Sequence, residues 1–169
     1  MDKMEMPDDF TRAITSGHLR SVYEPWRHVA GPRIGPRRCE TTPYHLRRTT
    51  PWIFIVDVID DGQDFRFGFA GERLMRFIAE RCATPSLAGL RDIAFFAAAE
   101  RLFRQCRETA RPLVSGPQPT AYKGKEHLER EVLLLPLSQD GTTVSGLLGA
   151  LDTWQLGTNA HAAEPVMAA

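Results

Sequence analysis

The stretch LEREVLLLPLSQDGTTVSGLLGALDTW, residues 128–154, contains the clearest structural signal of this chain. Two apolar runs rich in strand-forming residues flank the segment SQDG, which ends in Asp140 and Gly141. An Asp-Gly pair between two such runs is typical of a β-hairpin, because glycine adopts a positive φ without strain. We therefore predict two adjacent antiparallel strands over residues 128–137 and 143–153.

Two more strands are predicted upstream of this hairpin. Residues 52–59, WIFIVDVI, form a continuous β-branched and aromatic run that is typical of a strand buried at its centre. Residues 60–62, DDG, predict a turn, and residues 64–70 alternate between apolar and other side chains as a half-buried hairpin partner does. The face expected to turn inward holds Phe65, Phe67 and Phe69.

Helices are predicted before and after that pair of strands. Residues 72–80 and 90–110 carry apolar side chains at helical spacing, and an imperfect apolar stripe indicates a further helix near residues 10–26. Residues 113–122 are interrupted by Gly116, Pro117 and Pro119 and predict an edge strand. The order helix, β, β, α, α, β, β, β indicates an α+β domain with a five-stranded antiparallel sheet and helices on one face, plus the N-terminal helix.

Composition excludes several classes of protein. A chain of 169 residues is most simply one domain, and its formal net charge of zero gives no global field to attract nucleic acid or anionic lipid. Positive charge gathers in residues 12–48, where we expect a solvated, partly extended segment lying on the domain rather than an arm that binds an anion or a partner. Its arginines are Arg12, Arg20, Arg27, Arg33, Arg37, Arg38, Arg47 and Arg48. Without a secretory signal or a membrane-spanning run, a cytoplasmic location is expected.

The residues that most often carry chemistry show no catalytic or metal-binding pattern. Cys39, Cys82 and Cys106 are scattered, with no zinc-site spacing, and Cys106 is expected in the core. No nucleophile elbow, P-loop or dinucleotide fingerprint occurs. None of the five histidines falls within a predicted inner apolar stripe. We therefore expect no catalytic residue and no metal ligand.

Several pieces of sequence, taken in order, carry a resemblance to a known family. They are Trp26-Arg27, Gly31-Pro32, Pro36-Arg37-Arg38, Pro43, Leu46, residues 51–58 (PWIFIVDV), residues 64–67 (DFRF), Ala70-Gly71, Arg111-Pro112, residues 134–138 (LLPLS) and Asp140-Gly141. With these residues the chain, over residues 26–154, resembles the PAS fold and looks most like a family of small bacterial single-domain PAS-like proteins. Two departures are Gly68, where the family often has a basic residue, and residues 81–84 in place of its glycine-rich turn.

This resemblance implies signal sensing or partner binding rather than a defined reaction. It implies a pocket or packed core between the sheet and the helices that cover it. Cys82 lacks the surroundings of a flavin attachment site, and the helix 90–110 has no histidine to ligate haem, so we expect no cofactor. The implied division is an N-terminal helical extension (1–25), a PAS-like domain (26–156) and a flexible tail (157–169).

The leading functional hypothesis is a non-catalytic PAS-like sensory domain that binds a small apolar ligand or a signalling protein partner. Two alternatives stay open: a homodimerisation module with a filled core, and a small cone-fold isomerase or dehydratase. We also expect a homodimer that uses the N-terminal helix, and no binding to nucleic acid or membranes. The residues predicted to line a ligand site are Phe67, Phe69, Phe77, Phe95, Phe103 and Gly146.

Overall fold

A single five-stranded antiparallel sheet organises the molecule. The computed structural model describes residues 9–41, 52–80, 86–90, 92, 94–120 and 127–155. The strands lie in the order β2-β1-β5-β4-β3, and every neighbouring pair is antiparallel. Their bounds are Ile53–Ile59 (β1), Asp64–Ala70 (β2), Leu113–Pro119 (β3), Leu128–Leu137 (β4) and Gly146–Gln155 (β5). The predicted α+β architecture is confirmed, and β3 is an edge strand as expected.

The hairpin of β4 and β5 forms the centre of the sheet. Its ladder runs without interruption from Leu128 opposite Gln155 to Leu137 opposite Gly146. The connection is longer than a two-residue turn, so β5 begins three residues later than predicted. The Asp140 side chain accepts hydrogen bonds from the amides of Thr142 (2.8 Å) and Thr143 (2.7 Å). These amides are satisfied within the loop rather than by the ladder.

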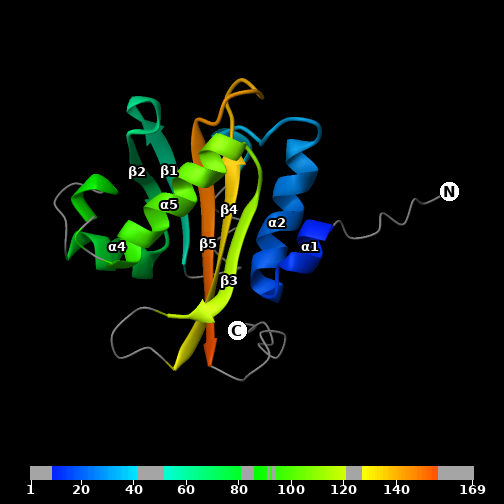
Figure 1. The fold of residues 1–169 in the computed structure, drawn as a ribbon. Helices are drawn as coiled ribbons and strands as arrows, with labels where there is room; N and C mark the ends of the chain where they lie inside the picture. The colour runs from blue at the N-terminus through cyan, green and yellow to red at the C-terminus, as the bar shows by residue number, and fades with distance from the viewer. Residues whose placement is uncertain are drawn as a thin grey trace.

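Helices cover both faces of this sheet, as Figure 1 shows. On one face lie α4 (Glu72–Ala79) and α5 (Ala94–Thr109), and on the other lie α1 (Asp9–Ala13) and α2 (Gly17–Ala30). Because successive strand residues point to opposite sides, β4 sends Leu134 toward α5 and Leu133 toward α2. Short 3-10 turns occur at Arg38–Glu40, Asp60–Gly62 and Ala88–Leu90. Among the residues that the structure describes, no helix is long and apolar enough to cross a membrane.

The predicted N-terminal helix is broken in two by residues 14–16. Ser16 caps α2 by accepting a hydrogen bond from the Leu19 amide (3.2 Å). The buried carboxylate of Glu131 on β4 accepts the amides of Thr15 (2.8 Å) and Ser16 (2.7 Å). Ser16 Oγ in turn donates to Asp152 on β5 (2.6 Å). This set of contacts, hereafter the Glu131 anchor, ties the start of α2 to the sheet.

The other end of α2 is held as firmly. The Trp26 indole donates to the carbonyl of Pro136 (3.0 Å), and a Cβ at Gly35 would overlap that same carbonyl, so the chain after α2 runs directly against β4. Ile14 and Leu19 are completely buried against the sheet. The apolar side chains that motivated a helix-mediated homodimer are therefore used within the subunit. Both the homodimer and the 1–25/26–156/157–169 division stay predictions.

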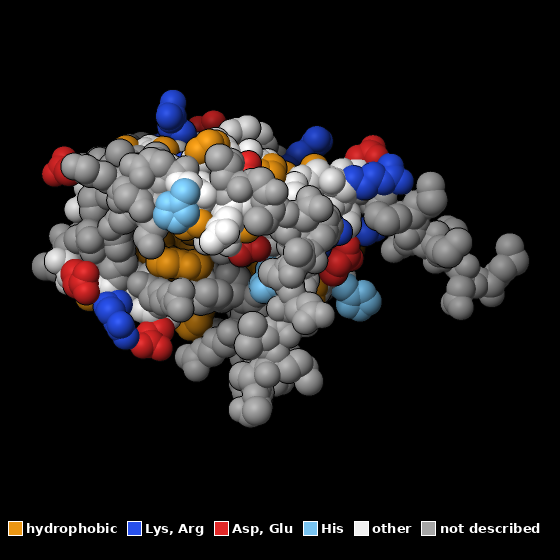
Figure 2. Space-filling view, turned by 90° about the horizontal axis from the view of Figure 1, so that it is seen from below, with side chains coloured by type: hydrophobic (Ala, Val, Ile, Leu, Met, Phe, Trp, Pro, Cys, Tyr) orange, Lys and Arg blue, Asp and Glu red, His pale blue; other side chains and the backbone are white. Residues whose placement is uncertain are grey.

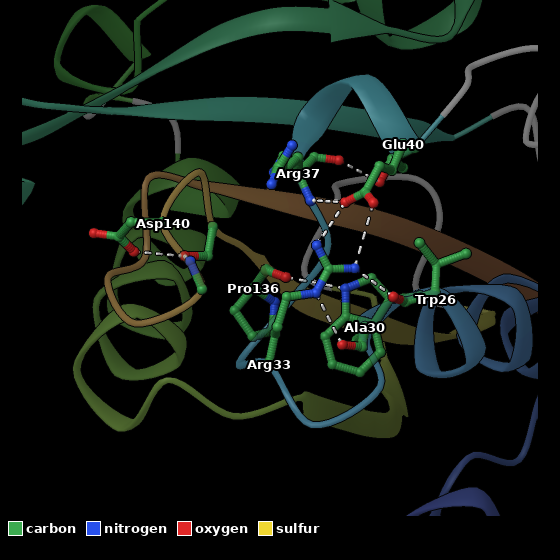
Figure 3. A network of polar contacts seen from close by, with 11 residues as sticks. Trp26, Ala30, Arg33, Arg37, Glu40, Pro136 and Asp140 are labelled. Atoms are coloured by element: carbon green, nitrogen blue, oxygen red, sulfur yellow. Dashed lines mark hydrogen bonds and ion pairs between the residues drawn. The ribbon is translucent and has the colours of Figure 1, made fainter.

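The arginine-rich segment makes contacts within the chain. Figure 3 shows Arg33 between α2 and the following turn, where it donates to the Ala30 carbonyl (3.2 Å) and pairs with Glu40 (2.8 Å). The pKa of Glu40 is lowered, chiefly by its hydrogen bond from Arg33. Arg38 pairs with Asp57 of β1. These contacts agree with a segment that lies on the domain.

The alternation predicted for β2 is wrong at its end. Val56 is opposite Phe67 and Ile55 is opposite Phe69, so Gly68 is an extra residue that forms a bulge. Beyond the bulge the side chains change faces. Phe65 and Phe67 pack under α5, whereas Phe69 packs with the cluster under α2. A Cβ at Gly68 would meet the Arg38 guanidinium and Asp57, which explains the small residue there.

Candidate ligand-binding site

A cavity of about 710 Å³ lies between the sheet and α5. It extends toward the end of the sheet where β4 begins and β5 ends. Figure 2, which looks onto that end, shows hydrophobic side chains in a hollow near the centre of the face. Its described lining consists of Trp52, Phe54, Phe67, Leu74, Phe96, Ala98, Ala99, Arg101, Leu102, Phe103, Ser115, Gln118, Thr120, Leu128, Arg130, Val132, Leu151 and Thr153.

Aromatic rings form the deep wall of this cavity. Phe54 of β1 lies against Phe103 of α5 with ring centroids 5.6 Å apart, and against Phe67 of β2 at 5.8 Å. Phe67 also contacts Phe96 edge to face at 6.1 Å. A Cβ at Gly149 of β5 would overlap the Phe54 ring, so this glycine makes room for the ring beside the strand. The inner end is therefore apolar and closely packed.

Polar side chains gather at the opposite end, in a row across three strands. In the sheet, Arg130 of β4 lies opposite Gln118 on the neighbouring strand β3 and opposite Thr153 on the neighbouring strand β5. All three line the cavity, and Arg101 of α5 lines it from the helix side. We call Gln118, Arg130 and Thr153 the polar row. Burial lowers the pKa of the Arg130 guanidinium from its ordinary value.

The predicted site residues divide between the two faces of the sheet. Phe67 and Phe103 line the cavity. Phe69 does not, because the bulge at Gly68 turns it toward α2. Gly146 lies on the α2 side as well, since Leu147 packs under α5 and Leu148 under α2. The side chains of Phe77 and Phe95 lie outside the described residues.

The residues missed from the sequence include the whole polar row. The strand pattern contained the necessary signal: in β4, Leu128, Arg130, Val132 and Leu134 share one face. The same alternation places Thr153 beside Leu151 on β5. Gly146 was chosen as the residue that makes room, whereas Gly149 has that role. Taking every second residue of a strand, starting from one that is known to face the cavity, identifies both the polar row and Gly149.

The titratable groups near the cavity offer little for acid–base chemistry. None of the described histidines (His18, His28 and His127) lines it, and no Asp or Glu appears in its described lining. Cys106 is buried in the core, as expected, and burial raises its pKa to about 12. Asp57 faces away and pairs with Arg38, not with its cross-strand neighbour Arg66. Within the described chain no group of three or more metal-ligating side chains occurs.

A comparison with protein families agrees with this architecture. The family model described as "PAS domain" matches residues 14–152. The chain belongs to the PAS domain family. Comparisons with curated proteins and with solved structures find no match. PAS domains are in general sensory or regulatory modules without catalytic activity, and here the match begins at Ile14, so that it includes α2.

Proposed function

We propose that this PAS domain is a non-catalytic sensor that holds a small, largely apolar molecule between the sheet and α5. The cavity of about 710 Å³ carries the proposal. Small-molecule sites in proteins commonly enclose roughly 300–1,000 Å³ and combine an apolar lining with a few placed polar groups. The aromatic wall and the polar row match that description. A signalling protein partner in the cytoplasm completes the proposal, because sensing requires an output.

The two alternatives receive less support. A homodimerisation module with a filled interior requires the bulky inward side chains to fill the space under α5, whereas the described ones border a cavity of about 710 Å³. A cone-fold isomerase or dehydratase requires a base that faces the cavity, and the described lining offers arginines, hydroxyl groups and one amide. Ligand binding is the function that this geometry favours.

Filling the cavity tests the proposal. Ala99 lines the cavity, whereas Ala97, two residues away on α5, is exposed. We expect Ala99→Phe to occupy the ligand space and Ala97→Phe to leave it open. Native mass spectrometry of freshly purified full-length protein should then show a bound small molecule in the wild type and in Ala97→Phe, but not in Ala99→Phe.

A fluorescent apolar dye provides the second readout when nothing co-purifies. Titration with 8-anilinonaphthalene-1-sulfonate should give weaker binding to Ala99→Phe than to Ala97→Phe, with circular dichroism showing both variants folded. Equal dye binding by the two variants, together with no co-purified molecule, would remove the cavity as a ligand site. The filled-core dimerisation module would then be the better explanation.

A further inference from the structure

We propose that the ligand is an amphipathic carboxylic acid, with its carboxylate on Arg130 and its apolar body directed toward the aromatic wall. This inference rests on the function proposed above and names the chemistry of the same site. It follows from the way charge is distributed between the two faces of β4 and β5. A neutral apolar molecule would need no cation in the lining.

Acidic and basic residues on these strands are sorted to opposite faces. Glu131 and Asp152, which are cross-strand partners, both lie on the α2 face and both bind the segment around Ser16. Arg130, the residue next to Glu131, lies on the cavity face. The acids nearest to Arg130 in sequence therefore point away from the cavity. Arg130 therefore brings a positively charged side chain to the side of the sheet where a ligand would bind.

The neighbours of Arg130 suit a carboxylate. In the polar row, Gln118 and Thr153 flank it on adjacent strands and supply an amide and a hydroxyl group, both of which can donate hydrogen bonds. Arginine presents several N–H donors in a planar fork that matches a carboxylate. Burial already disfavours the guanidinium charge, so a bound anion would offset part of that cost.

The arginines of α5 show a second separation of roles. Arg104 donates to the carbonyl of Gly62 (2.6 Å), and Arg107 pairs with Asp61 (2.6 Å), so both fasten the helix to the β1–β2 turn. Arg101 is exposed, lines the cavity and makes no ion pair with any described residue. Arg101 therefore adds a second positive charge at the cavity, whereas Arg104 and Arg107 hold the helix against the β1–β2 turn.

The path from the polar row to the aromatic wall runs along β4 and β5. Next to Arg130 on the cavity face comes Val132, paired with Leu151, and then Leu134 beside Gly149 and the Phe54 ring. A molecule with its carboxylate at Arg130 would therefore lay an apolar body along Val132 and Leu151 and end against Phe54. This arrangement excludes a ligand that is charged at both ends.

Isothermal titration of the full-length protein with octanoate, decanoate and dodecanoate, each compared with the 1-alkanol of the same length, tests the assignment. The best acid should bind about 10–100-fold more tightly than its alcohol, the range for a hydrogen bond to a charged group. Arg130→Gln should remove that preference by weakening acid binding far more than alcohol binding. Arg130→Lys should retain part of it, and Arg66→Gln, which removes an exposed arginine on β2 outside the cavity, should change neither affinity.

The outcomes separate this inference from the proposed function. Equal binding of acid and alcohol, or an unchanged acid preference in Arg130→Gln, would overturn the carboxylate assignment while the apolar site stands. Binding of neither compound would overturn both. If Arg130→Gln does not fold, wild-type protein and Arg101→Gln still decide: decyltrimethylammonium binding as tightly as decanoate contradicts the inference, and a reduced acid preference in Arg101→Gln supports it.

Discussion

The two faces of the sheet are built from the same strands but are filled differently. On the α2 face, Leu19 and Leu133 are completely buried, and the Glu131 anchor fixes the helix. On the α5 face, aromatic rings pack at one end, and a cavity of about 710 Å³ occupies the other. Alternate residues of β4 and β5 thus serve stability on one side and leave space on the other. Under the ligand-binding function proposed above, the closed face would hold the sheet while the open face would accept the ligand.

The largest expected difference between the faces is in the stability lost when a leucine on each face is truncated. Leu133 of β4 is completely buried under α2, whereas Leu151 of β5 is partly buried and lines the cavity. Leu133→Ala should lower the free energy of unfolding by about 2–5 kcal/mol, because closely packed atoms are lost. Leu151→Ala should cost less than about 2 kcal/mol, because its side chain already borders empty space. Urea denaturation of both variants checks the difference, and equal losses would show that the α5 face is as closely packed as the other.

A smaller effect is expected at the Glu131 anchor. Glu131→Gln retains one carbonyl oxygen in place of two carboxylate oxygens, so one of the buried amides of Thr15 and Ser16 loses its acceptor. The cost should be about 1–3 kcal/mol, and amide hydrogen exchange should rise in α2 before it rises in α5. The control is Glu129→Gln, because Glu129 is half-buried and accepts a hydrogen bond from the Trp154 indole (2.9 Å) rather than from the start of α2. Faster exchange in α5 than in α2 would contradict this role for the anchor.

The smallest effect on stability is expected at the exposed loop that joins β4 to β5. Hydrogen bonds from the amides of Thr142 and Thr143 hold the pKa of Asp140 well below its ordinary range. A lowered pKa in the folded state stabilises the fold at pH values above the unfolded pKa, and this contribution is lost as the pH falls through the folded value. Asp140→Ala should therefore be less stable than wild type at pH 7, and the gap should narrow in acid below about pH 4. Thermal unfolding at both pH values checks this, with the exposed Asp92→Ala as the control. A gap that is constant with pH would show that the carboxylate charge is not involved.

Local patterns in the sequence were sufficient for most of the elements. Continuous and alternating apolar runs predicted four strands, and the Gly and Pro interruptions of residues 113–122 predicted the edge strand β3. The strand β4 begins and ends at the predicted residues because its pattern is long and uninterrupted. The helices α4 and α5 were placed to within a few residues by their apolar stripes. The positive φ of Gly141 and the turn at Asp60–Gly62 also followed from local chemistry, because only a few residue types adopt such backbone angles easily.

The site was only partly predictable for a different reason. Phe67 and Phe103 were identified because each lies in a regular alternation or stripe. Phe69 was misplaced because a bulge at Gly68 depends on the pairing with β1, which no local pattern reveals. Arg130 was overlooked because a charged residue in a strand is usually assigned to solvent, and its position on the cavity face is apparent only once Val132 and Leu134 are known to face α5.

The sequence by itself determined the α+β class, the order of the elements and the hairpin at the centre of the sheet, because these depend on contacts between residues that are close along the chain. Only the tertiary structure decided that α2 closes the second face, since its anchor joins Ser16 to Glu131, 115 positions apart. It alone decided that the described side chains leave a cavity under α5. Whether packed side chains fill a volume depends on how distant elements meet, and no single element contains that information.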